Sequence, residues 1–281
     1  MKAIKGIILF CFLFVAVSGC FEAPVFSILP EITFNKIQFK DLPGPATNDS
    51  LILYLDFKDG DGDLGINADY LEEPFNASFY FLADGLGDTT KVATGVVYDA
   101  ENVPYIRLKS AGSTGKLVTN RTRDEPLYNY LPFYDNTSCL FYADDQLLVP
   151  ATAVDNSYNI ADSGFIDGDK YYLIEAEPLL YKANANHTNI DVTFYYNRTG
   201  SFVKFDWLKE YCFRFDARFP VLSNKNGPLE GTIRYAMASS GFTQTFGIAP
   251  LKLEIVIKDR ALHVSDTIVT PQFTLEGIRV N

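Results

Sequence analysis

The residues with the clearest chemical potential form one acidic segment, which reads DFKDGDGDLGI over positions 56–66. Asp59, Asp61 and Asp63 alternate with glycines, and carboxylates this close repel one another by somewhat under ~1 kcal/mol per pair in water. A bound hard cation removes that repulsion, and Ca²⁺ takes about six to eight oxygen ligands. The segment therefore predicts a structural calcium site with these three aspartates as ligands and Asp69 as a further candidate.

The acidic segment is not a complete EF-hand loop. Its sixth position holds Leu64 where a glycine is expected, and its twelfth holds Tyr70 in place of glutamate. It also follows a predicted strand, so it is more similar to the calcium loops that stiffen secreted β modules. The alternative is a solvated acidic turn, because Asp-Gly is a frequent turn pair.

Other residue patterns give little support to an enzyme. The two histidines, His187 and His263, lie in no recognisable catalytic motif, and the chain holds no G-x-S-x-G, H-E-x-x-H or P-loop pattern. We therefore expect a non-catalytic protein. The alternative is a carboxylate-dependent secreted hydrolase of the glycosidase type, which needs only two of the 35 acidic residues.

Aromatic residues supply a second candidate site. The chain holds 17 Tyr, 23 Phe and one Trp, and they are densest over residues 194–219. Aromatic rings stack on sugars in other carbohydrate-binding β modules, so Trp207 is a candidate ligand-binding residue for a glycan. The alternative is that these rings fill the core, since aromatic side chains dominate packing between strands.

The first twenty residues predict a lipid anchor. A positively charged start precedes an apolar run over 7–17, which is too short for a membrane span of about 20 residues. The following Val-Ser-Gly-Cys resembles the lipobox of bacterial lipoproteins, in which the cysteine becomes the lipidated first residue. We expect a signal peptide over 1–19, lipidation at Cys20 and a tether over 20–31. An ordinary secretory signal with an incidental cysteine is the alternative.

Charge and cysteine content narrow the location and the partners. The formal charge of −11, with no Lys/Arg cluster, argues against a nucleic-acid partner. Phe21 stands where aspartate often marks inner-membrane retention, so we expect the outer membrane, facing either the periplasm or the surface.

Once the signal peptide is removed and Cys20 is lipidated, Cys139 and Cys212 are the remaining thiols. They either pair in a disulfide, which would stabilise the folded state by about 4 kcal/mol, or stay as two buried free thiols.

Strand-like runs separated by Gly, Pro, Asn and Asp predict an all-β, antiparallel β-sandwich. Residues 251–258 alternate between apolar and polar side chains, as in a half-buried strand. The stretch 251–275 resembles the final hairpin of Ig-like or fibronectin-III-like modules. Together with the lipobox and the acidic segment, it makes the chain similar to uncharacterised Bacteroidota outer-membrane lipoproteins. The resemblance implies an Ig-like fold and a location but no activity.

Two divisions of the chain fit this pattern. One has a β-rich domain over 32–183 that carries the acidic segment, and an Ig-like sandwich over 187–281. The other has a single sandwich, built from 32–66 and 201–281, with a large insertion between them. In both, we expect a lipid-anchored, calcium-stabilised platform that binds a glycan or an outer-membrane protein.

Overall fold

The computed structural model describes residues 24–41, 49–83, 89–99, 101, 104–108, 115–119, 142–143, 147–154, 157–174, 179–211, 213–224 and 226–280. The predicted signal peptide, the lipidation site Cys20 and the cysteines Cys139 and Cys212 lie outside these residues. Within them, no helix is long and apolar enough to cross a membrane.

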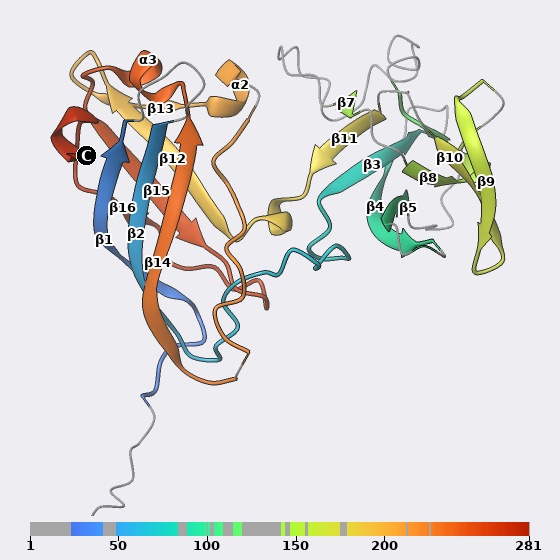
Figure 1. The fold of residues 1–281 in the computed structure, drawn as a ribbon, viewed down its shortest axis with the longest axis horizontal. Coiled ribbons are helices and arrows are strands. Elements are labelled where there is room, and N and C mark those ends of the chain that lie inside the picture. The colour runs from blue at the N-terminus through green and yellow to red at the C-terminus, as the bar shows by residue number, and fades with distance from the viewer. Residues whose placement is uncertain are drawn as a thin grey trace, which may run out of the picture.

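Two four-stranded sheets face each other and form a β-sandwich, on the left in Figure 1. The first sheet has the order β14 (Leu229–Ser239), β2 (Asp49–Asp59), β1 (Glu31–Lys40) and β17 (Arg279–Val280). The second has the order β13 (Phe202–Phe205), β12 (Ile190–Asn197), β15 (Leu251–Ile257) and β16 (Ile268–Val269). All neighbours are antiparallel except β1 and β17. The prediction of an all-β, sandwich-like fold is confirmed.

Alternation of apolar and polar side chains determines which face of each strand is buried. In β15 every second residue points into the sandwich, and Leu251, Leu253, Ile255 and Ile257 are fully buried. In β2 the residues Leu51, Leu53 and Leu55 are fully buried as well. The two rows meet in one core between the sheets, so β2 and β15 are held face to face.

An aromatic cluster fills one end of the sandwich core. The short helices α2 (Trp207–Tyr211) and α3 (Phe242–Phe246) bring Trp207, Phe242 and Phe246 against Phe194 of β12. Ring centroids in this cluster lie 5.5–6.1 Å apart, in edge-to-face and stacked arrangements. Most of the aromatic residues over 194–219 therefore pack against one another, which the core interpretation predicts.

A third, nine-stranded sheet lies between β2 and β12 in the chain, on the right in Figure 1. We call residues 78–183 the insertion. Its strands follow the order β7 (Tyr142–Ala143), β11 (Leu179–Ala183), β3 (Ser78–Ala83), β4 (Thr89–Tyr98), β5 (Pro104–Leu108), β8 (Leu147–Pro150), β10 (Asp169–Ile174) and β9 (Ile160–Ile166), with β6 (Lys116–Leu117) pairing beside β3. Its apolar residues form a core of their own, with Tyr80, Leu108, Leu147, Val149 and Ile174 at its centre. The sandwich consequently takes its strands from both sides of the insertion.

Two stretches connect the sandwich to the insertion, residues 67–77 going out and residues 184–189 returning. Arg218 donates from its guanidinium to the carbonyl oxygens of Asn67 and Tyr70, each at 3.0 Å, and also to those of Phe75 and His187. One side chain of the sandwich therefore holds both stretches. Short 3-10 helices complete the described structure: η2 (Ala151–Ala153), η3 (Ala185–His187) and η4 (Glu276–Ile278).

Candidate metal site

Two loops from different sheets meet at one end of the sandwich. Asp59 is the last residue of β2, and the acidic segment continues from it; Asp259 lies two residues after the end of β15. Leu64 pairs with Asp259 in an isolated antiparallel bridge, which joins the two loops directly. Because β2 and β15 face each other across the core, their ends bring aspartates from distant parts of the chain together.

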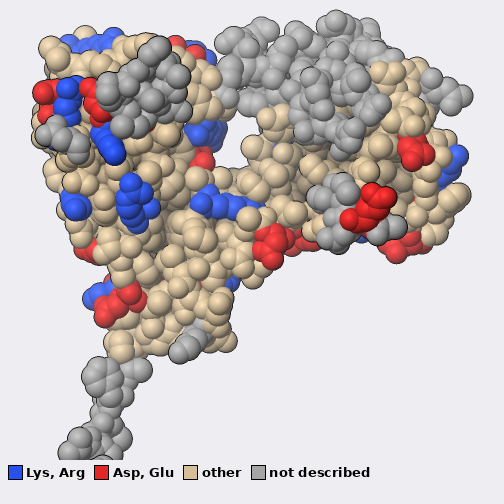
Figure 2. Space-filling view, viewed as in Figure 1, with Lys and Arg blue, Asp and Glu red and all other residues tan. Residues whose placement is uncertain are grey.

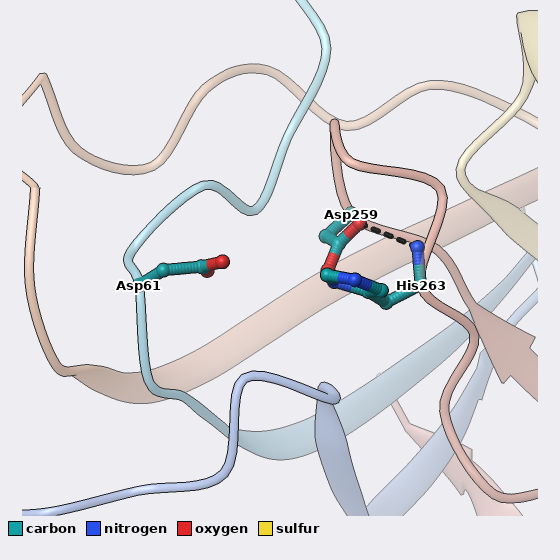
Figure 3. A group of neighbouring side chains, drawn as sticks. All are labelled: Asp61, Asp259 and His263. Carbon is teal, nitrogen blue, oxygen red and sulfur yellow. Dashed lines mark hydrogen bonds and ion pairs between the residues drawn. The ribbon is translucent and has the colours of Figure 1, made fainter.

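The carboxylates of these loops converge on one point. Oxygen atoms of Asp59, Asp61, Asp63 and Asp259 all lie within 4.8 Å of one another. Asp61, Asp259 and His263 form an overlapping group with the same spacing. Figure 3 shows Asp61 extending from its loop toward Asp259 and His263 on the other. This spacing suits several ligands of a single metal ion, and we call the four aspartates the acidic cluster.

Three oxygens of the acidic cluster are buried without a hydrogen-bond partner. They are the Oδ1 atoms of Asp59, Asp61 and Asp63. Asp59 and Asp259 as whole residues are 0% exposed. An unpartnered buried carboxylate oxygen costs free energy, and most buried polar atoms in proteins are paired for that reason. A cation among these oxygens would supply the missing partner for all three.

Hydrogen bonds hold the other oxygens of the cluster in place. The backbone N–H of Leu64 donates to Oδ2 of Asp59 at 3.3 Å, and that of Ala261 donates to Oδ2 of Asp63 at 3.0 Å. His263 holds Asp259 through its backbone N–H, at 2.7 Å, and its Nδ1, at 2.8 Å. In Asp59 and Asp63 one oxygen is thus fixed by the backbone and the other is left facing the cluster.

Burial and mutual repulsion disfavour the charged form of these carboxyls. Burial raises the pKa of Asp59 to about 6, and the charges of Asp61 and Asp63 add to the effect. Burial also raises the pKa of Asp63, with further contributions from Asp259 and Asp61. The pKa of Asp259 is raised by burial, although the hydrogen bonds from His263 oppose the rise. Ionisation of these carboxyls is therefore unfavourable without a cation, and a bound cation would neutralise their charges.

Glycines let the acidic segment pass close to its neighbours. A Cβ on Gly60 would lie 2.6 Å from the carbonyl oxygens of Phe26 and Ser27, which belong to the tether. Gly65 has a φ of +96°, and a Cβ there would collide with the carbonyl of Pro220. These contacts restrict the backbone of the acidic segment to the path that directs its aspartates toward one another.

The structure brings together three of the four predicted ligands. Asp69 is exposed and belongs to neither metal-compatible group among the described residues. Sequence reasoning missed Asp259 and found no motif that gives His263 a role. The available signal was that Asp259 directly follows the strongly alternating run 251–258, but nothing local indicates which other strand end it meets.

Trp207 occupies a position that does not suit the predicted sugar platform. It is only 4% exposed, and its indole lies 4.9 Å from the rings of both Phe205 and Phe215 and 5.3 Å from that of Phe213. A ring this buried leaves no face on which a sugar could stack, so the residue serves the core.

The acidic cluster could hold a metal ion, through carboxylate oxygens drawn from both sheets of the sandwich. Comparison of the chain with protein-family models, with curated proteins and with solved structures finds no match.

Proposed function

We propose that this chain is a non-catalytic, lipid-anchored protein of the bacterial outer membrane, similar to Bacteroidota lipoproteins, in which a calcium-stabilised β-sandwich supports binding of a glycan or a partner protein. The observation that carries the calcium site is the convergence of three buried, unpartnered carboxylate oxygens, on Asp59, Asp61 and Asp63, with Asp259.

The chemistry of the donors favours calcium. All four residues of the acidic cluster offer oxygen, which hard cations such as Ca²⁺ prefer, whereas structural zinc sites use Cys and His. The Nδ1 of His263 already contacts Asp259, so the histidine orients a ligand from outside the oxygen set. Calcium also accepts carbonyl oxygens and water, which would complete its about six to eight ligands.

A structural ion fits this position better than a catalytic one. A catalytic metal keeps a coordination position open to substrate, whereas Asp59 and Asp259 are fully buried. An ion here would join the end of β2 in one sheet to the loop after β15 in the other. Its expected effect is to hold this end of the sandwich closed.

The tether leaves the protein beside the acidic segment. Phe26 and Ser27 approach Gly60 closely, and the ammonium of Lys58 lies 5.3 Å from the centre of the Phe26 ring. Val25, Ile28 and Leu29 are exposed, at 95%, 56% and 51%. An acyl chain on Cys20 would therefore suspend the sandwich by its calcium end, through only a few intervening residues.

Thermal unfolding of residues 21–281, in Ca²⁺ and in chelator, tests the ion site. At a hundred times the dissociation constant, binding adds ~2.7 kcal/mol, which raises Tm by a few degrees. We expect Asp61→Asn to abolish this rise and Asp69→Asn, the matched control outside the cluster, to retain it. A wild-type protein that melts at the same temperature in both solutions would refute the calcium site.

The lipid anchor is tested separately in cells. We expect the full-length chain to incorporate labelled fatty acid and to fractionate with the outer membrane, and Cys20→Ala to lose both properties. Unlabelled wild-type protein in the soluble fraction would contradict the anchor without bearing on the ion site.

A further inference from the structure

Exposed aliphatic side chains gather where the tether meets the sandwich. Val25, Ile28 and Leu29 all lie in solvent, although the chain around them is held in place. The carbonyl oxygen of Ser27 lies against Gly60, and the backbone N–H of Leu29 donates to Oγ of Ser27 at 3.0 Å. Aliphatic side chains fixed in water are unfavourable, and a surface that covers them removes that cost.

The loop over 222–228 lies at the same end of the sandwich. The backbone N–H of Leu222 donates to the carbonyl oxygen of Leu64 at 3.3 Å, and that of Gly227 donates to the carbonyl oxygen of Asp61 at 2.9 Å. The loop is thus attached to the acidic segment, as the tether is. Leu222 is exposed, and the residues of the loop that the structure describes carry no charge. Figure 1 shows the loop, which leads into β14, at the end from which the tether leaves. We call the three aliphatic side chains of the tether and this loop the apolar end.

Charged side chains begin beside the apolar end. Glu31, Lys58 and Glu230 are in register across β1, β2 and β14 and form one row. In Figure 2 the lower end of the sandwich is largely tan on the face in view, and charged side chains lie above it. Asp61 and Asp63 of the acidic cluster also lie nearby, and the proposed ion would neutralise them. An apolar tip followed by charged side chains is the pattern with which amphipathic elements lie at a bilayer surface.

The proposed anchor lies close to the apolar end in the chain. Cys20 stands five residues before Val25, and five extended residues span at most about 18 Å. The headgroup layer on each side of the hydrocarbon core is about 5–8 Å thick. Because the tether is held against the sandwich at Gly60, lipid attached to Cys20 keeps the apolar end within reach of the headgroups.

We propose that the apolar end seats directly on the lipid bilayer, with its exposed aliphatic side chains at the boundary between headgroups and acyl chains. The inference rests on the proposed anchor at Cys20, to which it adds a folded contact surface. A bilayer is favoured over a partner protein because a stable protein interface buries about 800 Å² on each partner, more than these few side chains offer. Seating fixes the orientation of the sandwich, with the end that carries α2 and α3 directed away from the membrane.

Tryptophan quenching tests the contact. The mature chain can be ligated through its N-terminal Cys20 to a lipid thioester and placed in vesicles of phosphatidylcholine and phosphatidylethanolamine, with or without brominated acyl chains. Trp207 is 4% exposed, and its signal is measured in the wild type and subtracted. We expect brominated lipid to remove most of the added fluorescence of Leu222→Trp and of Ile28→Trp. Ile248→Trp is the control, 91% exposed and beyond α3 at the opposite end, and should be unaffected.

The probe at position 222 decides the result. Leu222 lies far from Cys20 in the sequence, so it touches lipid only if the folded end does. Asn226→Trp, on the same loop, takes its place if that variant does not fold. Adding Ile28→Asp together with Leu29→Asp should reduce the quenching at the loop.

Three results would overturn the contact surface. Quenching of Ile28→Trp without quenching in the loop would mean that only the tether touches lipid, and quenching of neither would mean that nothing at this end does. Equal quenching of Ile248→Trp would mean that the sandwich has no fixed orientation. Unquenched loop probes in a chain that sediments as a dimer would assign the apolar end to a second copy. Because the lipid is attached chemically, these results do not depend on lipidation in cells, which the fatty-acid labelling of the wild type and Cys20→Ala decides separately.

Discussion

Individual carboxyls in the acidic cluster have opposite effects on stability with and without an ion. Asp59 is fully buried, and its Oδ1 has no hydrogen-bond partner among the described residues. Without a cation, its charge is desolvated and repelled by its neighbours; with one, the same charge becomes a ligand. The sign of its contribution therefore depends on the ion.

Asp59→Asn tests this reversal. In chelator we expect the variant to melt above the wild type, because the substitution removes a buried, repelled charge. In saturating Ca²⁺ we expect it to melt below the wild type, since a ligand is lost. The measurement is thermal unfolding of both proteins in both solutions, and Asp69→Asn should shift neither Tm. A variant that is less stable in both solutions would mean that Asp59 is a structural acceptor only.

Acid pH should weaken calcium binding at the proposed site. The pKa of Asp59 is about 6 in the folded protein, against 3.8 for an ordinary aspartate. The folded state without an ion is therefore favoured by protonation and loses stability as pH rises from about 4 through about 6. Calcium requires the deprotonated form, so the difference in Tm between Ca²⁺ and chelator should be larger at pH 7 than at pH 5. Equal differences at the two pH values would contradict this linkage.

The elements that form the site depend on one close approach between loops. Gly65 has a φ of +96° and lies against the carbonyl of Pro220, whereas Gly200 has a φ of +97° with nothing near its missing Cβ. The two glycines have nearly the same positive φ and differ in the space around the missing Cβ.

Gly65→Ala and Gly200→Ala therefore form a matched pair. Each pays about 1 kcal/mol or more for an alanine at positive φ, but only position 65 also suffers a collision. We expect Gly65→Ala to lower the free energy of unfolding more than Gly200→Ala and to weaken the calcium-dependent rise in Tm. Chemical denaturation of both variants measures the difference. Equal losses would mean that the loop relaxes around the new methyl group.

The sequence predicted where strands form better than it predicted which strands pair with each other. The alternating run over 251–258 corresponds to β15, because a period of two follows directly from one buried face. The period does not determine which strand pairs with which, so the pairing of β2 with β14 could not be predicted from the sequence. Asp259 was missed for the same reason, since it joins the site only through the facing sheet.

On the scale of the whole molecule, Arg218 connects the sandwich to both stretches that lead to the insertion. Its guanidinium donates to carbonyls in both connecting stretches, and Asn184 of the returning stretch donates to the carbonyl of Pro74 in the outgoing one, at 2.8 Å. These bonds hold the two connecting stretches, which we call the base of the insertion, against the sandwich. The outgoing stretch directly follows the acidic segment.

Arg218→Met should loosen that base without unfolding either core. We expect limited proteolysis within residues 67–77 to become several-fold faster, because several carbonyls lose their donor at once. Arg214→Met is the control, since Arg214 is more exposed and forms an ion pair with Asp216, at 3.6 Å. Cleavage at wild-type rate in Arg218→Met would show that the backbone bonds between the stretches suffice.

The split origin of the sandwich has a consequence for the order in which the chain assembles. β1 and β2 emerge first during synthesis, but β14, which pairs with β2 along its whole length, lies beyond the insertion. The insertion has its own core, and once folded it brings its two ends together, because Ser78 of β3 pairs with Ala183 of β11. This shortens the effective loop that closure of the sandwich must span. An early-folding insertion would thus act as an internal template that lets strands from the two ends of the chain find one another.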